Sequence, residues 1–295
     1  MPIWVLYALL ASASMAAVSV IDKSVLANWM TDIRGSFFAF SVIEMLSGII
    51  ALLWLGVPAL PPVQLLVALA SGAALSLSTF CYFRAIQLGE VSRLVPLASL
   101  SPLVVAAFAA LVLQEIFPPI KYAGVLFIVL GALLASLKRL RGFRFGKGVG
   151  WMLLSMLLVS AGAIASKHAL AQSDPWTIFA YGKIGTSFVG APFLASGYRA
   201  FASAVRKHGR IVLSLTGLSE GLTSITTIFF LSASATGYVT LVNALVGTQP
   251  LFLLLFTALA MRHWPGIISE EQGGGLLARK IAAIALLLAG AWIVA

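Results

Sequence analysis

Three ionisable residues, Glu44, Lys183 and Glu220, lie within long apolar segments of the sequence. A charged side chain in the hydrocarbon of a bilayer costs about 3 kcal/mol on insertion scales, so it normally faces a partner or a water-filled cavity. One lysine cannot neutralise two carboxylates, and the additional acid is therefore either protonated or available to a cation. These residue types predict a site for substrate binding or ion coupling, where a substrate carboxylate meets Lys183 and a substrate ammonium meets an acid.

A purely structural role for these charges is the alternative interpretation. A salt bridge between Lys183 and either Glu44 or Glu220 would order the helices without contacting a substrate. In a third alternative, a proton competes with the substrate for one of the glutamates. The sequence leaves these interpretations open, although the surplus acid favours a functional role.

Two further lysines, Lys23 and Lys167, lie late in apolar segments and are candidate residues of a substrate path or gate. Each could instead extend its ammonium group to the membrane interface, as long basic side chains do. Asp22, the neighbour of Lys23, is interpreted as its local partner. Glu115 follows an apolar segment and is interpreted as an ordinary loop charge.

Two prolines, Pro102 and Pro250, interrupt apolar segments and predict helix kinks, because each removes a backbone hydrogen-bond donor. The freed carbonyl groups need other polar partners, and the cavity candidates Asn243 and Gln249 lie close to Pro250 in the sequence. We expect these two amides to line a cavity, although amides also join transmembrane helices. Tyr181 is a further candidate for substrate contact, because it lies two residues from the central lysine.

The composition of the 295-residue chain excludes a water-soluble globule, because 61% of the residues are hydrophobic and only 9% are charged. A transmembrane helix needs about 20 residues, so the chain has room for about ten crossings and none for a separate catalytic domain. Cys81 is the only cysteine and the three histidines are scattered. We therefore expect no disulfide framework, no metal centre and no cofactor.

The sequence predicts an all-α integral membrane protein. Apolar runs, and the prolines and glycines between them, define ten expected transmembrane helices. These helices cover residues 3–21, 36–55, 63–83, 94–113, 120–137, 149–167, 176–196, 210–231, 238–260 and 279–295.

The net charge of +10 is distributed as a topology signal rather than as a nucleic-acid-binding surface. Sixteen of the 19 basic residues fall in the odd-numbered connections, whereas two, Lys121 and Lys167, fall on the even-numbered side. The positive-inside rule then places the odd-numbered loops in the cytoplasm and both termini outside. We expect a bacterial inner-membrane protein that has the lipid bilayer as a partner and binds no nucleic acid.

An internal repeat divides the chain into two similar halves. Residues 82–115 match residues 230–263 at a constant offset of 148. Five helices per half is an odd number, so the second half enters the membrane upside down relative to the first. Inverted-topology repeats of this kind alternate between outward-open and inward-open shapes around a midplane site.

The repeat predicts a first five-helix unit over residues 1–141, a basic cytoplasmic connector over residues 142–148, and a second, inverted unit over residues 149–295. It also aligns Glu44 with Lys183. An approximate two-fold axis in the membrane plane would place these two residues at similar depth on facing halves, where an ion pair is expected.

The repeat and its motifs resemble a known family. The pattern Ala-Ile-Gln-Leu-Gly, followed by Leu-Ser-Pro-Leu, Gln-Glu and Gly-Val-Leu-Phe-Ile-Val-Leu-Gly, is similar to that of EamA-type transporters of the drug/metabolite transporter superfamily. The resemblance covers nearly the whole chain and implies ten helices, alternating access and outward transport. Family members move amino acids, sugars, nucleotide conjugates and other metabolites, so the resemblance does not identify the substrate.

An enzymatic function is not expected. The residues Gly217-Leu-Ser-Glu-Gly221 match the G-x-S-x-G pattern of hydrolases, which requires a strand, a sharp turn and a helix to expose the serine. That context is missing here, and in an apolar helix the two glycines instead predict a close-packed face.

Together these features predict a secondary transporter that exports a small polar organic metabolite, such as an amino acid or a related compound. An exchanger or flippase of an anionic or lipid-linked substrate is the alternative, favoured if Lys23, Lys167 and Lys183 all face the cavity. A proton or a counter-substrate is left open as the coupling partner. A functional monomer is consistent with a chain that already holds both halves.

Overall fold

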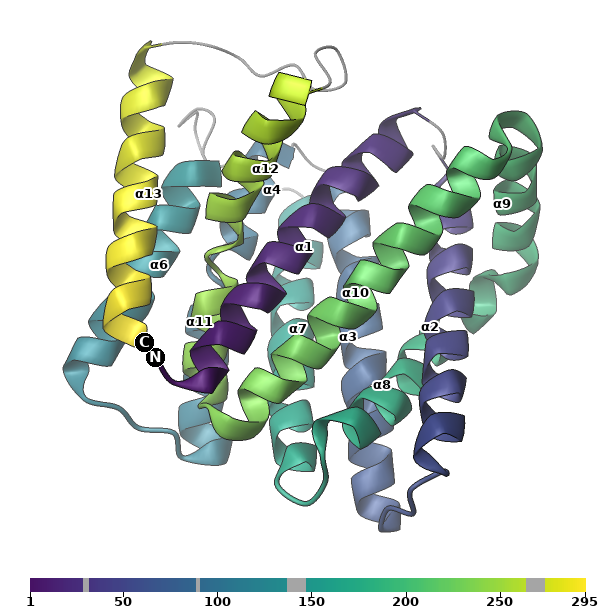
Figure 1. Ribbon diagram of the computed structural model, residues 1–295, viewed down its shortest axis with the longest axis horizontal. Helices are drawn as coiled ribbons and strands as arrows, with labels where there is room; N and C mark the ends of the chain where they lie inside the picture. The colour runs from purple at the N-terminus through teal and green to yellow at the C-terminus, as the bar shows by residue number, and fades with distance from the viewer. Residues whose placement is uncertain (29–31, 89–90, 137–146, 264–273) are drawn as a thin grey trace.

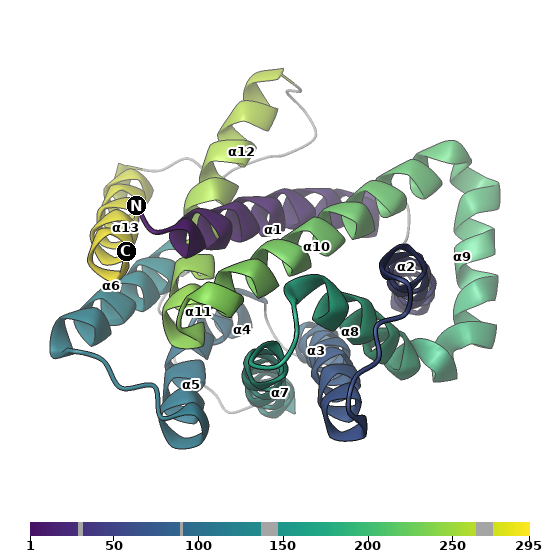
Figure 2. The same cartoon turned by 60° about the horizontal axis from the view of Figure 1, so that its bottom comes forward.

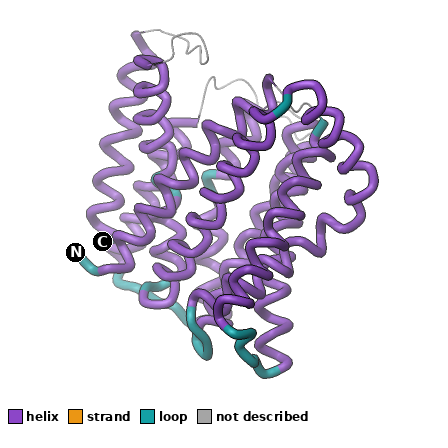
Figure 3. Tube along the Cα trace, turned by 45° about the vertical axis from the view of Figure 1, so that its right-hand side comes forward, coloured by secondary structure: helices purple, strands orange, loops and turns teal. Residues whose placement is uncertain are grey.

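The computed structural model describes residues 1–28, 32–88, 91–136, 147–263 and 274–295, and within these ranges it contains helices and no strands (Figures 1 and 3). The helices of the first half are α1 (Ile3–Asn28), α2 (Ile33–Leu55), α3 (Pro62–Leu88), α4 (Val91–Ala98), α5 (Ser101–Phe108), the π-helical turn η1 (Ala109–Leu113) and α6 (Pro119–Ser136). Those of the second half are α7 (Lys147–Leu170), α8 (Pro175–Gly190), the 3-10 turn η2 (Ala191–Phe193), α9 (Leu194–His208), α10 (Arg210–Thr236), α11 (Val239–Val246), α12 (Gln249–His263) and α13 (Gly274–Val294).

Large apolar side chains point outward from these helices. Leu111 is 82% exposed, Ile116 80% and Trp292 83%, which a surface in water would disfavour and the hydrocarbon of a bilayer accommodates. Within the described residues, eight helical segments are long and apolar enough to cross a membrane. The chain is therefore an integral membrane protein.

Two of the expected helices are divided rather than kinked. The segment expected over residues 94–113 forms α4, α5 and η1, and the segment over residues 238–260 forms α11 and α12. Pro102 and Pro250 each occupy the second position of a new helix. Proline is favoured in a first helical turn, where its missing N–H is not needed, so the structure places the two prolines at helix starts.

The expected helix over residues 176–196 is also divided and is longer than predicted. It consists of α8, the turn η2 around Pro192, and α9, which continues to His208. The 16 residues of α8 span about 24 Å at 1.5 Å per residue, which is shorter than a hydrocarbon core of about 30 Å. The two helices together, rather than α8 alone, are long enough to reach from one side of the bundle to the other.

The bundle has two opposite ends, which we name by their features. Figure 1 shows both chain termini at one end, the termini face, to which α7 and α10 descend. At the opposite end α1 and α3 finish, α2 and α10 begin, and α9 finishes. We call this end the basic face, because these helix ends include Arg34, Arg84, Arg206, Lys207 and Arg210.

Apolar packing joins the two halves of the chain. The largest cluster of buried side chains contains Val5 of α1, Ile128 of α6, Leu245 of α11 and Leu287 of α13. Helix α1 packs against α10, α3 against α7, α2 against α8, and α6 against α13 (Figures 1 and 2). The halves are therefore interleaved rather than placed side by side.

Glycines allow α8 to approach its neighbours closely. A Cβ at Gly185 would overlap the carbonyl group of Leu69 in α3, and one at Gly72 of α3 would overlap the carbonyl group of Gly182. On the other side of α8, a Cβ at Gly48 of α2 would lie 2.9 Å from the Ala180 carbonyl oxygen. These contacts position α8, and with it Lys183, between α2 and α3.

The close-packed face predicted at Gly217 and Gly221 is wrong for this structure. A Cβ added at either glycine would meet no atom within 4 Å, so among the described residues no helix packs closely against this face of α10. The spacing of the two glycines places them on one helix face, but packing also needs a partner helix that approaches that face.

Gly185→Ala is expected to lower the free energy of unfolding by about 2 kcal/mol, because its methyl group would overpack the contact with α3. Gly182→Ala is the matched control on the same helix, since its Cβ would meet only the Ala68 carbonyl oxygen, at 3.9 Å. Thermal and denaturant unfolding in detergent would compare the two variants. Equal stability of the two variants would contradict the packing described for α8.

Candidate functional site

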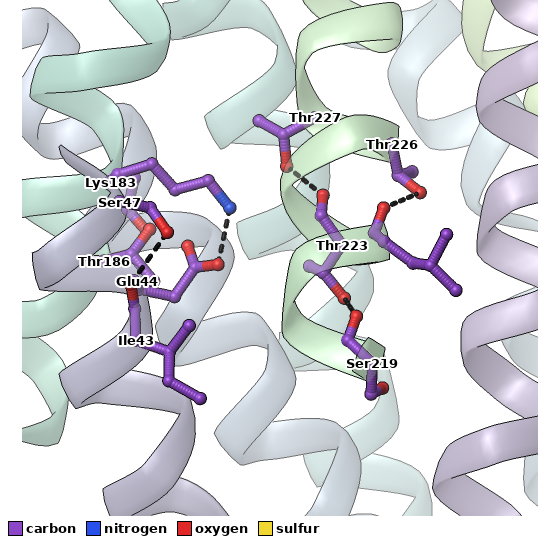
Figure 4. Close-up of polar contacts among 11 residues, drawn as sticks. Ile43, Glu44, Ser47, Lys183, Thr186, Ser219, Thr223, Thr226 and Thr227 are labelled. Atoms are coloured by element: carbon purple, nitrogen blue, oxygen red, sulfur yellow. Dashed lines mark hydrogen bonds and ion pairs between the residues drawn. The ribbon is translucent and has the colours of Figure 1, made fainter. Parts of the chain in front are cut away.

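A buried ion pair lies at the centre of the bundle. The Lys183 Nζ of α8 is 2.5 Å from the Glu44 Oε1 of α2, and the two side chains are 4% and 3% exposed. Figure 4 shows both side chains pointing toward α10. Lys183 also lies 5.3 Å from the centroid of the Phe179 ring, which adds a cation–π contact. The structure thus brings together two of the three charges singled out in the sequence.

The third charge, Glu220 of α10, lies beside a cavity. Its Oε2 atom is buried and has no hydrogen-bond partner in the structure. The charges of Glu44, Asp22 and Lys183 all act on it. The surplus carboxylate expected from the sequence therefore lies near the ion pair without forming part of it.

The cavity beside Glu220 has a volume of 150 Å³ and is formed by α1, α2, α3 and α10. Its lining consists of Met15, Val18, Asp22, Val25, Ser36, Phe37, Phe40, Thr79, Phe83, Thr216, Ser219, Glu220 and Thr223. The lining residues lie in the later parts of α1 and α3, which end at the basic face, and in the earlier parts of α2 and α10, which begin there. The cavity therefore extends from the middle of the bundle toward the basic face.

Asp22 is a cavity residue that sequence reasoning missed. Its carboxylate accepts a hydrogen bond from the Ser219 Oγ of α10. The sequence does contain a signal, because Met15, Val18, Asp22 and Val25 have the 3-4-3 spacing of one helix face. The interpretation of Asp22 as a local partner of its neighbour overlooked this spacing.

A second cavity of 380 Å³ adjoins the first at the basic face, and the two share Phe37 and Phe83. It is also lined by Asp32, Arg34 and Arg84, with Phe80 and Gln87. Arg34 pairs with Asp32 at 2.9 Å, and its hydrogen bond lowers the pKa of that carboxyl group. Both cavities therefore contain carboxylates, but within the described residues only the outer one is lined by guanidinium groups.

Polar contacts join two helices of the second half at the termini face. The Lys167 Nζ of α7 donates to the carbonyl oxygens of Ser234, at 2.6 Å, and Gly237, at 2.9 Å, at the end of α10. The last carbonyl groups of a helix have no N–H partner within it, and the helix dipole favours a cation at that end. Lys167 thus ties α7 to the C-terminal end of α10.

Glu115 is not the ordinary loop charge that the sequence indicated. The residue lies in a connection, but it is only 6% exposed. Its carboxylate accepts from the backbone N–H groups of Val239, at 3.0 Å, and Thr240, at 3.2 Å, and from the Thr240 hydroxyl at 2.9 Å. It therefore caps the N-terminus of α11, a contact between segments that sequence proximity does not reveal.

The remaining sequence candidates lie outside the lining of the inner cavity. The Tyr181 hydroxyl donates to the Pro58 carbonyl oxygen at 2.7 Å, Asn243 donates to the Val239 carbonyl oxygen, and Gln249 donates to Ser19 of α1 at 2.8 Å. These contacts join helices or stabilise one. The side chain of Lys23 lies outside the described part of the structure.

Comparison with known proteins relates the chain to membrane transporters. The sequence profile of the EamA-like transporter family matches residues 2–137. A Sinorhizobium protein described as an uncharacterized transporter in the cobO 3' region is 33% identical over 135 residues, which cover 45% of this chain and 96% of the relative. The chain belongs to the EamA-like transporter family. This EamA-like chain also resembles a solved structure, described only as the crystal structure of a protein, with a TM-score of 0.70 and 21% identity over 99% of this chain and 94% of the other.

The family assignment and the structural likeness cover different parts of the molecule. The profile match lies within the first half, whereas the structural likeness extends over both halves and shows the fold. The EamA-like chain is thus a membrane transporter whose second half has the fold of a solved structure. The charged residues of the cavity come from both parts of the chain.

Lys183→Met or Glu44→Gln alone is expected to lower the free energy of unfolding by about 3 kcal/mol, because either change leaves one buried charge without its partner. The double variant is expected to recover most of this loss. Lys207→Met, at an exposed position of α9, is the control for removal of a lysine. A double-mutant cycle from denaturant unfolding tests the pair, and additive losses would contradict it.

Proposed function

We propose that this EamA-like protein is a secondary transporter that exports a small polar organic metabolite, such as an amino acid or a related compound, by alternating access. One observation carries the proposal: a cavity lined by acids leads to the basic face, while polar contacts of Lys167 and Glu115 hold the helices together at the termini face. A channel would need both ends open at once. A cavity that is open at one end and closed at the other is the arrangement that alternating access requires.

The closing contacts are suited to reversible opening. Lys167 and Glu115 both hold the connection between α10 and α11, one at the end of α10 and the other at the start of α11. Each contact is a set of hydrogen bonds, to backbone groups and in the case of Glu115 also to the Thr240 hydroxyl, that water can replace when the helices separate. In the proposed transport cycle these contacts break as the cavity closes at the basic face.

An inverted repeat with ten crossings supports this cycle. Helices α4 and α11 begin and end 148 residues apart, at Val91 and Val239 and at Ala98 and Val246, and α5 and α12 begin at the same offset. The repeat also relates the contact of α1 with α10 to that of α7 with α3. We propose that the units 1–141 and 149–295 exchange conformations between the two access states, and that Lys23, the repeat counterpart of Lys167, acts at the opposite gate.

The membrane orientation completes the proposal. The excess of basic residues in the odd-numbered loops places the basic face in the cytoplasm and both termini outside. The structure would then have its cavity accessible from the cytoplasm, which is the state that loads a substrate for export. A bacterial inner membrane is the proposed location.

The anionic or lipid-linked alternative requires free lysines at the cavity. Lys183 is paired with Glu44, and Lys167 donates to two carbonyl oxygens, so both ammonium groups already have protein partners. The inner cavity instead contains two acids. These contacts support a metabolite with a cationic group over an anionic substrate.

Efflux of a mixture of compounds from proteoliposomes tests the proposed function whichever metabolite is the substrate. Vesicles loaded with amino acids, polyamines, sugars and organic acids are expected to lose at least one component faster than vesicles without protein. Glu220→Gln is expected to slow this loss by at least about tenfold, because it removes an ionisable carboxyl group that lines the cavity.

Asp174→Asn is the control for that efflux assay. It removes a carboxylate from the N-cap of α8, outside the cavity, and asparagine caps a helix about as well as aspartate. Its efflux rate should match that of the unmodified protein. The proposal would be contradicted if vesicles with the unmodified protein retained every compound. It would also be contradicted if Glu220→Gln and the unmodified protein gave equal efflux rates.

A further inference from the structure

We infer that the ligand of the inner cavity is an amphiphilic organic cation, a molecule with a protonated amine beside an apolar ring or chain. The inference rests on the proposed function, because it names the substrate class of the same cavity. It departs from a zwitterionic ligand held between Lys183 and an acid, which the sequence alone had suggested.

The charges around the cavity carry the first step. Asp22 and Glu220 line it, and no lysine or arginine does so within the described residues. In the same part of the chain, neither acid forms an ion pair, whereas Lys183 is paired with Glu44. Among the residues whose side chains the structure describes, a ligand carboxylate would therefore meet two acids and no unpaired cation in the lining, while an ammonium group would meet complementary charge.

Unmet hydrogen bonds point to the same ligand. Three buried polar atoms at the cavity have no partner in the structure: the Ser36 Oγ, the Thr216 Oγ1 and the Glu220 Oε2. An ionised carboxylate only accepts hydrogen bonds, and a hydroxyl can also accept one. A primary ammonium group has three N–H donors, so a single ligand atom can satisfy Glu220 together with neighbouring oxygens.

The remaining wall of the cavity is apolar and aromatic. Phe37, Phe40 and Phe83 line one side, with the Phe37 ring centroid 5.7 Å from that of Phe40 and 6.3 Å from that of Phe83. Met15 and Val18 of α1 line another side. Such a wall favours a hydrophobic group and binds cations through the faces of its rings, whereas it offers little to a sugar or to a fully polar polyamine.

The neighbouring outer cavity determines how such a ligand lies. Its Arg34 charge is already paired with Asp32, but the guanidinium group of Arg84 repels an ammonium group, while Asp22 and Glu220 attract it inward. The amine is therefore placed against the two acids, and the apolar body lies against Phe37 and Phe83, which the two cavities share.

A set of three ligands with one ring and different charges tests this inference on the purified full chain. Phenethylamine carries a cation, L-phenylalanine a zwitterion and phenylpropionate an anion. Calorimetric titration and thermal unfolding are expected to show tightest binding and the largest increase in Tm for phenethylamine. Glu220→Gln and Asp22→Asn should each weaken phenethylamine binding by at least about tenfold, since each removes a charged acceptor.

Asp174→Asn again serves as the control, and its affinity for phenethylamine should stay within about twofold of the unmodified protein. Tighter binding of L-phenylalanine or phenylpropionate than of phenethylamine would overturn the inference. So would an unchanged affinity for phenethylamine in folded Glu220→Gln and Asp22→Asn proteins. Absence of amine binding would also overturn it. Stabilisation by sodium chloride to the same extent as by the amine would identify an inorganic cation site instead.

These measurements separate the two proposals, because binding needs no membrane or gradient. Efflux of a sugar or an organic acid from the loaded vesicles, together with no phenethylamine binding, would support the transport function and contradict the organic-cation ligand. Phenethylamine binding without efflux of any compound would leave the cation site and reject transport.

Discussion

The buried pair of Lys183 with Glu44 is the interaction on which the site depends. Its two side chains are taken out of contact with solvent, so each charge must be satisfied by the other. Close glycine contacts of α8 with α2 and α3 hold Lys183 in place for that purpose. Because Glu44 already pairs with the central lysine, the two acids that line the inner cavity, Asp22 and Glu220, are left for a ligand.

The two ends of the bundle use polar groups in opposite ways. At the termini face, Lys167 and Glu115 bind backbone groups of the other segments and hold the helices together. Toward the basic face, the polar atoms of Ser36, Thr216 and Glu220 border a cavity and lack such partners. A second arrangement, with these roles exchanged, is what a transport cycle needs.

The helical fold, and the presence of charged residues within the helices, could be predicted from the sequence for physical reasons. An apolar run of about 20 residues has few alternatives to a transmembrane helix, and Glu44, Lys183 and Glu220 were recognisable because charge is rare in such runs. Contacts between distant segments were not predictable in the same way. The cap that Glu115 places on α11 and the hydrogen bond of Asp22 to Ser219 depend on packing, which a single sequence does not contain. Likewise, Pro102 and Pro250 marked interruptions, but not whether each would bend a helix or begin one.

Thiol labelling from each side of sealed, oriented vesicles tests the central claim most directly. In a Cys81→Ala background, Thr223→Cys places a thiol at the cavity, and Gln172→Cys and Ser203→Cys mark the termini face and the basic face. The account predicts that an impermeant maleimide reaches Thr223→Cys only from the basic face, and that adding Lys167→Met allows labelling from the termini face as well. Labelling of Thr223→Cys from the termini face in the presence of Lys167, or from neither side, would contradict it.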